Sequence, residues 1–314
     1  MIEDEFKNIL DREYYPDMIK RHYTETINLL KEVTNYGARL IVRIFSLTKG
    51  EVKDVVVIAN LLKQVVTFLD ATEILVSQGA ITAAALPLRS LFEVRLFVEW
   101  ILDSDTDFRA KSYYVWYLRK THSINSWGIV GSDRNSDMKK ILSKSGRENV
   151  LNRAEKLNDR LIQENNAIKE LLESEFYADI NQSFEILKKG RKNNWYAINK
   201  GPQDLREIAC KLNIEDEYVI VYSSLSKIAH GVSIEKQVVV EEDNVIFEHV
   251  RNLKGTKTIL NGALNCAFSV YRKILQHYIP SELENYNRKY VEEWRDRYLN
   301  IPEVELNSSE TINT

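Results

Sequence analysis

The feature that most constrains this sequence is the repetition of apolar residues at helical spacing. Between 11 and 47 they recur about every 3.6 residues, which is the period of an α-helix, and a similar pattern covers 52–77. Only 11 Gly and 5 Pro interrupt the 314 residues, so long helices are expected. The sequence therefore predicts an all-α protein. The first stripe consists of Ile19, Tyr23, Ile27, Leu30, Val33, Leu40 and Ile44.

The segment 80–102 is apolar on nearly every face, which is typical of a central helix surrounded by others. It also holds the four charged residues Arg89, Glu93, Arg95 and Glu99. Four charges in about 20 residues argue against a membrane span. We therefore expect this segment to lie at the centre of a multi-helix bundle.

The rest of the chain predicts one helical domain over 1–300 and a polar tail over 301–314. Within it, 147–189 is charged with a sparse apolar stripe, and we expect a protruding helical segment that could contact a protein partner. One small β-hairpin is expected near 232–250, because two Val- and Ile-rich runs flank an acidic connection.

Composition narrows the function classes. The acidic N-terminus is unlike a secretory signal, and the two cysteines, Cys210 and Cys266, lack disulfide or metal-ligand spacing. A cytoplasmic protein with no membrane partner is therefore predicted. The formal net charge of −3 gives no general attraction to nucleic acid. No phosphate loop, dinucleotide fingerprint or zinc motif is present in the sequence, so neither a cofactor nor a metal is expected.

Two polar groups interrupt apolar helical patterns. Arg89 and Glu93 are four residues apart and share one helix face, and Tyr222, Ser226 and His230 form a second stripe at the same spacing. We expect the two stripes to face each other and form a shared polar pocket. Arg89 would hold an anion such as a phosphate, and His230 would exchange a proton. The alternative is structural, because buried Arg–Glu pairs often fix helix register and a terminal His often caps carbonyls.

These residues carry a resemblance. Arg-Ser-Leu-Phe-Glu at 89–93, followed by Trp195 and by Tyr222-x-x-x-Ser226-x-x-x-His230-Gly231, resembles a bacterial all-helical family of unknown function, over roughly 55–278. The resemblance implies that Arg89, Glu93, Trp195, Tyr222, Ser226 and His230 belong together. It implies no established activity.

More loosely, the helical architecture is similar to the HEPN superfamily, which includes defence and toxin ribonucleases. Those enzymes cleave RNA without a metal through Arg followed four to six residues later by His. No Arg stands at that spacing before His230, whereas Arg272 and His277 fit it. Arg272 and His277 are therefore an alternative catalytic pair, or an ordinary helix surface.

A basic cluster beside two aromatic residues is the best candidate for nucleic-acid binding, because cations contact phosphates and aromatic rings stack on bases. The alternative is a solvated loop. The candidate residues are Lys188, Lys189, Arg191, Lys192, Trp195 and Lys200.

Three functions remain open. The first is an RNA- or DNA-acting effector, specifically a metal-independent ribonuclease in phage defence or a toxin system. The second is a nucleotide- or anion-sensing module. The third is a non-catalytic scaffold that forms a homo-oligomer.

Overall fold

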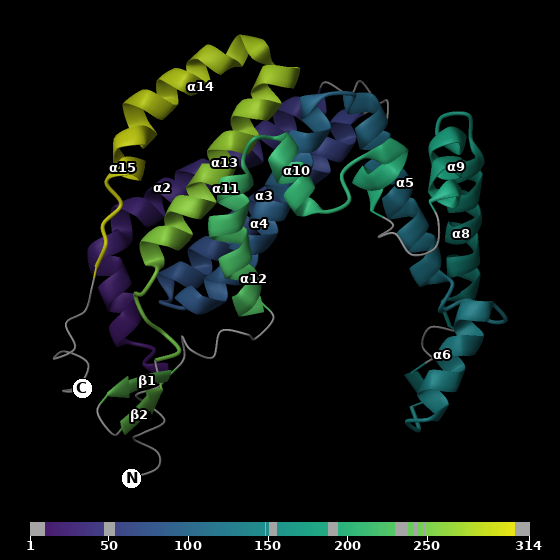
Figure 1. The fold of residues 1–314 in the computed structure, drawn as a ribbon, viewed down its shortest axis with the longest axis horizontal. Helices are drawn as coiled ribbons and strands as arrows, with labels where there is room; N and C mark the ends of the chain where they lie inside the picture. Colours follow the sequence, from purple (N-terminus) through teal and green to yellow (C-terminus); the bar gives the residue numbers. More distant parts are fainter. Residues whose placement is uncertain are drawn as a thin grey trace. The chain divides into compact units, whose positions relative to one another are not determined.

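In a computed structural model of the chain, the regular secondary structure of the described residues is helical apart from one pair of short strands (Figure 1). Contacts divide it into two compact units, whereas the sequence predicted one domain over 1–300. Unit 1 comprises Met1–Ser104 with Ile208–Thr314, and unit 2 comprises Asp105–Glu207. The described residues are 10–46, 54–147, 149–150, 156–187, 194–229, 238–241, 244–247 and 249–304.

Four long helices form the body of unit 1. Each packs on the next, α2 on α3, α3 on α4 and α4 on α13, and α13 also packs on α2 (Figure 1). The arrangement confirms the all-α prediction and places α4 at the centre. The four helices are α2 (Tyr14–Phe45), α3 (Asp54–Ser77), α4 (Ile81–Asp103) and α13 (Thr256–Tyr278).

The apolar stripe of α2 is the reason that this helix packs on the bundle. All seven apolar residues predicted to form the stripe are buried, while charged residues occupy the opposite face. At the crossing of α2 and α13, Gly37 leaves room for the ring of Tyr271, whose hydroxyl donates to the Val33 carbonyl at 3.1 Å. A Cβ added at Gly37 would overlap that ring, so the close approach of the two helices depends on glycine here.

A tight turn reverses the chain between α3 and α4. Gly79 adopts a positive φ of 67°, and the amide of Ala80 donates to the Leu75 carbonyl at 2.9 Å. This is the hydrogen-bond pattern of a glycine-terminated helix end. This turn reverses the direction of the chain, so α4 packs alongside α3.

One helix among the described residues, α3, has the length and composition of a membrane span, and half of its most apolar stretch is buried in the protein. Its buried side chains include Ile58, Leu61, Leu62, Val65 and Leu69, which pack between α2 and α4. The same apolar composition is required of a core helix in a soluble bundle, and the burial of α3 fits that role.

Two short strands lie in the chain between residue 229 and α13. Strands β1 (Val238–Glu241) and β2 (Asn244–Phe247) pair antiparallel, with Val238 opposite Phe247. They lie within the 232–250 segment for which the sequence predicted a hairpin. After α13, unit 1 contains a 3₁₀ helix (Pro280–Glu282), α14 (Leu283–Lys289), a π-helix (Tyr290–Trp294) and α15 (Arg295–Leu299).

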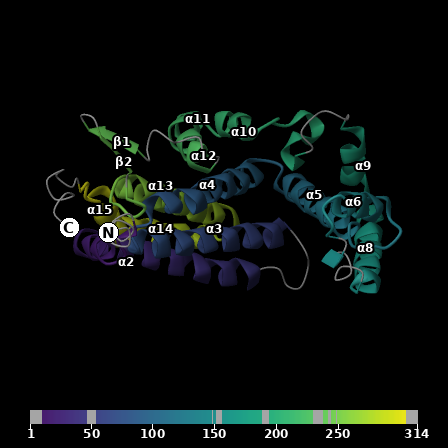
Figure 2. The same cartoon turned by 90° about the horizontal axis from the view of Figure 1, so that it is seen from below.

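The segment 215–229 forms one continuous helical stretch of three parts, and its last part packs on α4 (Figures 1 and 2). It begins with α11 (Glu215–Glu217), continues as a π-helix (Tyr218–Tyr222) and ends with α12 (Ser223–Ala229). A π-helix has i→i+5 hydrogen bonds and is often found at functional sites.

Unit 2 is built on α5, against which α8, α9 and a short 3₁₀ helix pack. The predicted protruding segment 147–189 therefore contributes two packed helices to this unit, with Leu172, Ile180 and Phe184 buried. α10 (Leu205–Lys211) leads back into unit 1. The helices of unit 2 are α5 (Thr106–Asn125), α6 (Asp133–Ser143), α8 (Asn158–Glu173), α9 (Ala178–Ile186) and the 3₁₀ helix Trp195–Lys200.

Candidate functional site

The candidate site lies on unit 1, where α4 meets the helical stretch 215–229. Arg89 and Glu93 stand one turn apart on α4 and form an ion pair with an N–O distance of 2.9 Å. About a quarter of each side chain is exposed, 25% for Arg89 and 26% for Glu93. The pair therefore sits at the edge of the bundle, where a ligand could reach it.

Tyr222 joins this pair from the facing helix. Its hydroxyl accepts a hydrogen bond from Arg89 Nη2 at 2.7 Å and donates one to Glu93 Oε1 at 2.7 Å. The Arg89 guanidinium also lies 5.0 Å from the centre of the Tyr222 ring. The structure thus brings together Arg89, Glu93 and Tyr222, which we call the edge triad, as expected from the two stripes. Its role in catalysis stays a prediction.

The electrostatics of the edge triad keep the phenol protonated. Burial of the Tyr222 ring raises the pKa of its hydroxyl, and the hydrogen bond to Glu93 and the charge of that carboxylate raise it further, against the opposing charge of Arg89. At neutral pH the triad therefore combines a guanidinium cation, a protonated phenol and a carboxylate that accepts protons. Such a set can bind an anion and move a proton beside it.

The remaining members of the second stripe are only partly described. Ser226 is half-buried, one helical turn after Tyr222. His230, predicted to exchange a proton, and Gly231 lie outside the described residues. The geometry of the site therefore rests on the edge triad.

A second ion-pair network on α4 was not predicted as a site. Arg95 donates from Nε to Glu99 at 2.7 Å, and from Nη1 and Nη2 to the two carboxylate oxygens of Glu217 at 2.6 and 3.1 Å. The Arg95 side chain is only 4% exposed. In the sequence, Arg95 and Glu99 stand out only as charges that argue against a membrane span.

Helix α13 completes this second network. Asn265 donates to Glu217 at 2.9 Å and Ser269 donates to Glu99 at 2.6 Å. We call Arg95, Glu99, Glu217, Asn265 and Ser269 the buried network. Because each carboxylate has further donors, the buried charges are compensated, as the interior of a protein requires.

The thiol of Cys266 lies beside the buried network. Burial raises its pKa to about 12, and the nearby Arg95 guanidinium partly opposes that shift. The thiol stays protonated at neutral pH, so Cys266 acts as a small buried side chain rather than a nucleophile.

The residues of the predicted nucleic-acid patch divide into two groups. Lys188, Lys189, Arg191 and Lys192 lie outside the described residues. Trp195 is buried in unit 2, at 2% exposure, with its ring edge-on to Tyr113 at 5.4 Å. A buried indole offers no open face to a base, so Trp195 is placed as a packing residue. Lys200 is exposed at the end of the 3₁₀ helix.

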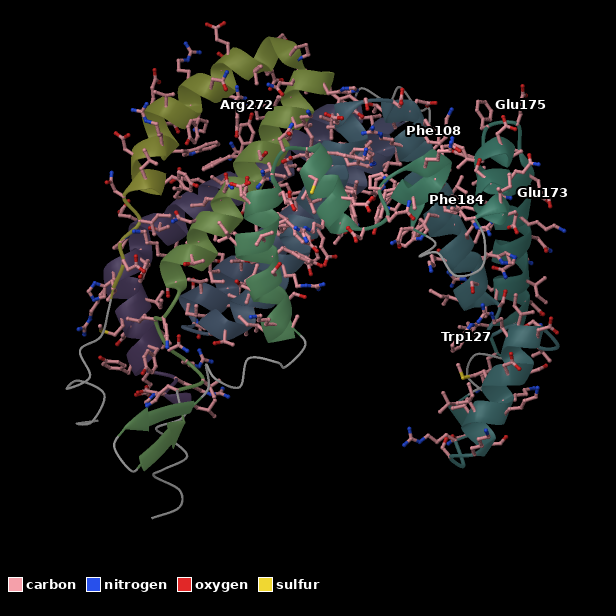
Figure 3. All side chains as sticks on the ribbon, in the orientation of Figure 1. Phe108, Trp127, Glu173, Glu175, Phe184 and Arg272 are labelled. Atoms are coloured by element: carbon pink, nitrogen blue, oxygen red, sulfur yellow. The ribbon has the colours of Figure 1, made fainter. Side chains whose placement is uncertain are left out.

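The alternative pair Arg272 and His277 lies exposed on α13 (Figure 3 labels Arg272). Residues five apart on an α-helix point roughly 140° away from each other. His277 packs edge-on against Tyr278 at 4.6 Å. The helix therefore does not direct these two side chains to one point, although their spacing in sequence fits the ribonuclease motif.

Comparison with known proteins adds a family. Residues 55–246 match a family model described as a family of unknown function, DUF5677. The chain belongs to this family. The match covers more than half of the chain and includes α4 and the whole stretch 215–229, so both networks on α4 contain family positions. It ends before α13, although the sequence resemblance was traced to about residue 278. No curated protein and no solved structure matches the chain, and no match to the HEPN superfamily is found.

Proposed function

We propose that this protein acts on RNA, cleaving the phosphodiester backbone at the edge triad without a metal. The observation that supports this proposal most strongly is the position of the Tyr222 hydroxyl, bonded to both Arg89 and Glu93. A cation, a proton donor and a proton acceptor thus meet at a partly exposed edge. Those are the groups that metal-free cleavage of RNA requires.

The proposed reaction moves one proton through the triad. Glu93 takes the proton of the ribose 2′-hydroxyl, whose oxygen forms a bond to phosphorus. The bond from phosphorus to the 5′-oxygen breaks, and that oxygen takes the proton of Tyr222. Arg89 neutralises the added charge on the phosphate oxygens. The phenolate then recovers the proton from Glu93 along their existing hydrogen bond, and the products are a 2′,3′-cyclic phosphate and a 5′-hydroxyl.

The cellular setting belongs to the same proposal. A metal-independent ribonuclease acting in the cytoplasm, as part of phage defence or a toxin system, would arrest growth when expressed. The two cysteines without a disulfide framework suit a reducing compartment. Ser226 and His230 continue the stripe from Tyr222, but no step is assigned to His230 because it lies outside the described residues.

The test is a comparison of two tyrosines. Tyr222→Phe removes the hydroxyl of the edge triad, and Tyr278→Phe removes another buried hydroxyl that donates to a carboxylate, Asp54, at 2.5 Å. Purified wild-type protein should release cyclic-phosphate ends from a labelled RNA. Tyr222→Phe should slow that release by about 100-fold or more, because general acid–base catalysis contributes that much. Tyr278→Phe should cleave at the wild-type rate.

Other results would decide against cleavage. If Tyr222→Phe and Tyr278→Phe cut RNA equally fast, the activity does not come from the edge triad. If the wild-type protein cuts nothing but is stabilised by phosphate or nucleotides through Arg89, the anion-sensing function replaces the proposal. If it does neither and forms a homo-oligomer by light scattering, the scaffold function replaces it.

A further inference from the structure

A cleft in unit 2 is lined by charged and aromatic side chains. Its volume is about 520 Å³, within the size range of small-molecule sites. Three helices each contribute one face to it, with Trp116, Arg119 and Lys120 on α5, Lys169 and Glu173 on α8, and Phe184 and Glu185 on α9. Figure 3 labels Glu173 and Phe184 on their separate helices. Arg134, in the first turn of α6, also lines the cleft.

Buried amides hold the walls of the cleft in place. Asn165 of α8 donates to the His122 carbonyl and the Ser126 hydroxyl at the end of α5, both at 3.2 Å. Asn135 of α6 donates to the Trp127 carbonyl at 2.9 Å. Both amides are almost fully buried, at 6% and 1% exposure, so they join α8 and α6 to the same end of α5. The cleft is therefore a formed feature of unit 2.

The charges of the cleft do not balance. Arg119 pairs with Glu185 at 2.7 Å, and Lys169 lies 4.0 Å from Glu173. Lys120 and Arg134 are exposed, and among the described residues no carboxylate forms an ion pair with either of them. Two cations thus remain for a ligand, so the cleft favours an anion.

Aromatic surface lies next to those cations. Trp116 is partly exposed in the cleft, and the Lys120 ammonium lies 5.8 Å from the centre of its ring. Arg119 covers the Phe184 ring at 5.3 Å and is held there by Asn181 as well as Glu185. An indole and a flat guanidinium are both surfaces on which a nucleic-acid base stacks.

We propose that this cleft binds a nucleoside phosphate, with its phosphate held by Lys120 and Arg134 and its base against Trp116. The ligand would be a free nucleotide or the phosphorylated end of an RNA strand, since both present the same chemistry. This site is separate from the edge triad, and binding here does not depend on cleavage there.

The test is a calorimetric titration of the full chain with two probes. One probe is ADP, and the other is a short 5′-phosphorylated 2′-O-methyl oligouridylate, which lacks the 2′-hydroxyl needed for cleavage. Lys120→Glu with Arg134→Glu should weaken binding by roughly 100-fold, about tenfold for each lost charge-assisted contact. The matched control is Lys140→Glu with Lys144→Glu, which makes the same charge change at the C-terminal end of α6, outside the cleft. The control should bind as the wild type does.

The two probes separate the sources of the ligand. ADP binding that the cleft variant loses and the control keeps identifies a free nucleotide as the ligand. Binding of the oligouridylate alone, with the same dependence, identifies an RNA end. Trp116→Leu should weaken the binding of either ligand. The helix content of this variant, measured by circular dichroism, should equal that of the wild type. The inference is overturned if neither probe binds at about 1 mM, or if the cleft and control variants lose binding equally. Cleavage of labelled RNA and calorimetric binding are separate measurements, so failure here and failure of the cleavage proposal are distinct.

Discussion

Helix α4 carries two Arg–Glu pairs of the same spacing that differ in their surroundings. Arg89 and Glu93 are about one-quarter exposed, whereas Arg95 and Glu99 are 4% and 10% exposed. Each pair receives one partner from the facing stretch 215–222. The buried pair directs Nε, Nη1 and Nη2 of Arg95 to carboxylates, and only 4% of the Arg95 side chain is exposed, so a ligand does not reach it. The difference teaches that burial, rather than spacing, separates a structural ion pair from a candidate site.

Breaking the buried network should have the largest effect on stability. Arg95→Met removes the cation between Glu99 and Glu217 and leaves the Glu99 carboxylate, only 10% exposed, without its charged partner. Removing one partner of a buried ion pair costs about 3–5 kcal/mol, so urea unfolding should show a loss of that size. Arg89→Met at the edge should cost about 1 kcal/mol or less, because exposed pairs are weak. Equal losses in the free energy of unfolding for Arg95→Met and Arg89→Met would show that the difference in exposure does not affect stability.

Alkaline pH should distinguish Cys266, beside the buried network, from Tyr222 of the edge triad by the pH at which each begins to lower the stability of the fold. The pKa of Cys266 rises from 9.0 in the unfolded chain to about 12 in the folded protein. Between these values the unfolded state has lost the proton and the folded state keeps it, so stability falls as pH rises, by about 1.4 kcal/mol per pH unit. Below pH 9 this contribution is fully present.

Each variant removes one proton's share of the alkaline loss, to which other buried tyrosines with a raised pKa, such as Tyr271 and Tyr286, also contribute. Cys266→Ala should flatten the stability curve from about pH 9, and Tyr222→Phe should flatten it only from about pH 10, its ordinary value. Urea unfolding at a series of pH values measures both curves against the wild type. A curve that stays unchanged in Cys266→Ala would contradict the raised pKa of the buried thiol.

The smallest stability effect, and the sharpest contrast in function, should come from matched glutamates. Glu93→Gln removes a partly exposed carboxylate and should change stability by less than about 1 kcal/mol. It should also slow RNA cleavage by about 100-fold, because the proton acceptor is lost. Glu99→Gln should be the more destabilising change while cleavage by the folded fraction stays at the wild-type rate. Cleavage assays on folded protein and unfolding curves measure both effects. If Glu99→Gln slows cleavage and Glu93→Gln does not, Glu93 is not the proton acceptor.

Local patterns in the sequence predicted the helices and one of the two networks. The stripe of α2 follows from spacing alone, and all of its members are buried. Arg89 and Tyr222 were found because each is a polar residue in an apolar helical pattern. Their pairing could be inferred because each stripe needs a polar partner across the bundle.

What could not be predicted depends on contacts distant in sequence. Glu217 and Ser269 lie 122 and 170 residues from their partners on α4, and nothing near Arg95 indicates that these two helices meet there. The unit 2 cleft was missed for a related reason. Its side chains have the spacing of ordinary charged helix faces, and only the folded arrangement of α5, α6, α8 and α9 gathers them. The division into two units likewise lacks a Gly- or Pro-rich linker in the sequence.

The π-helix at Tyr218–Tyr222 allows one helical stretch to contact both Arg–Glu pairs of α4. Glu217 and Tyr222 are five residues apart, and in a regular α-helix they would point to different sides. The wider i→i+5 turn returns both to α4, with Val219 and Ile220 facing solvent at 48% and 70% exposure. A one-residue deletion between them would place them four residues apart, a spacing at which a regular α-helix presents both side chains on one face. Among relatives of this chain, a segment one residue shorter within 218–222 therefore marks a protein that reaches both Arg95 and Arg89 from a regular α-helix instead of a π-helix.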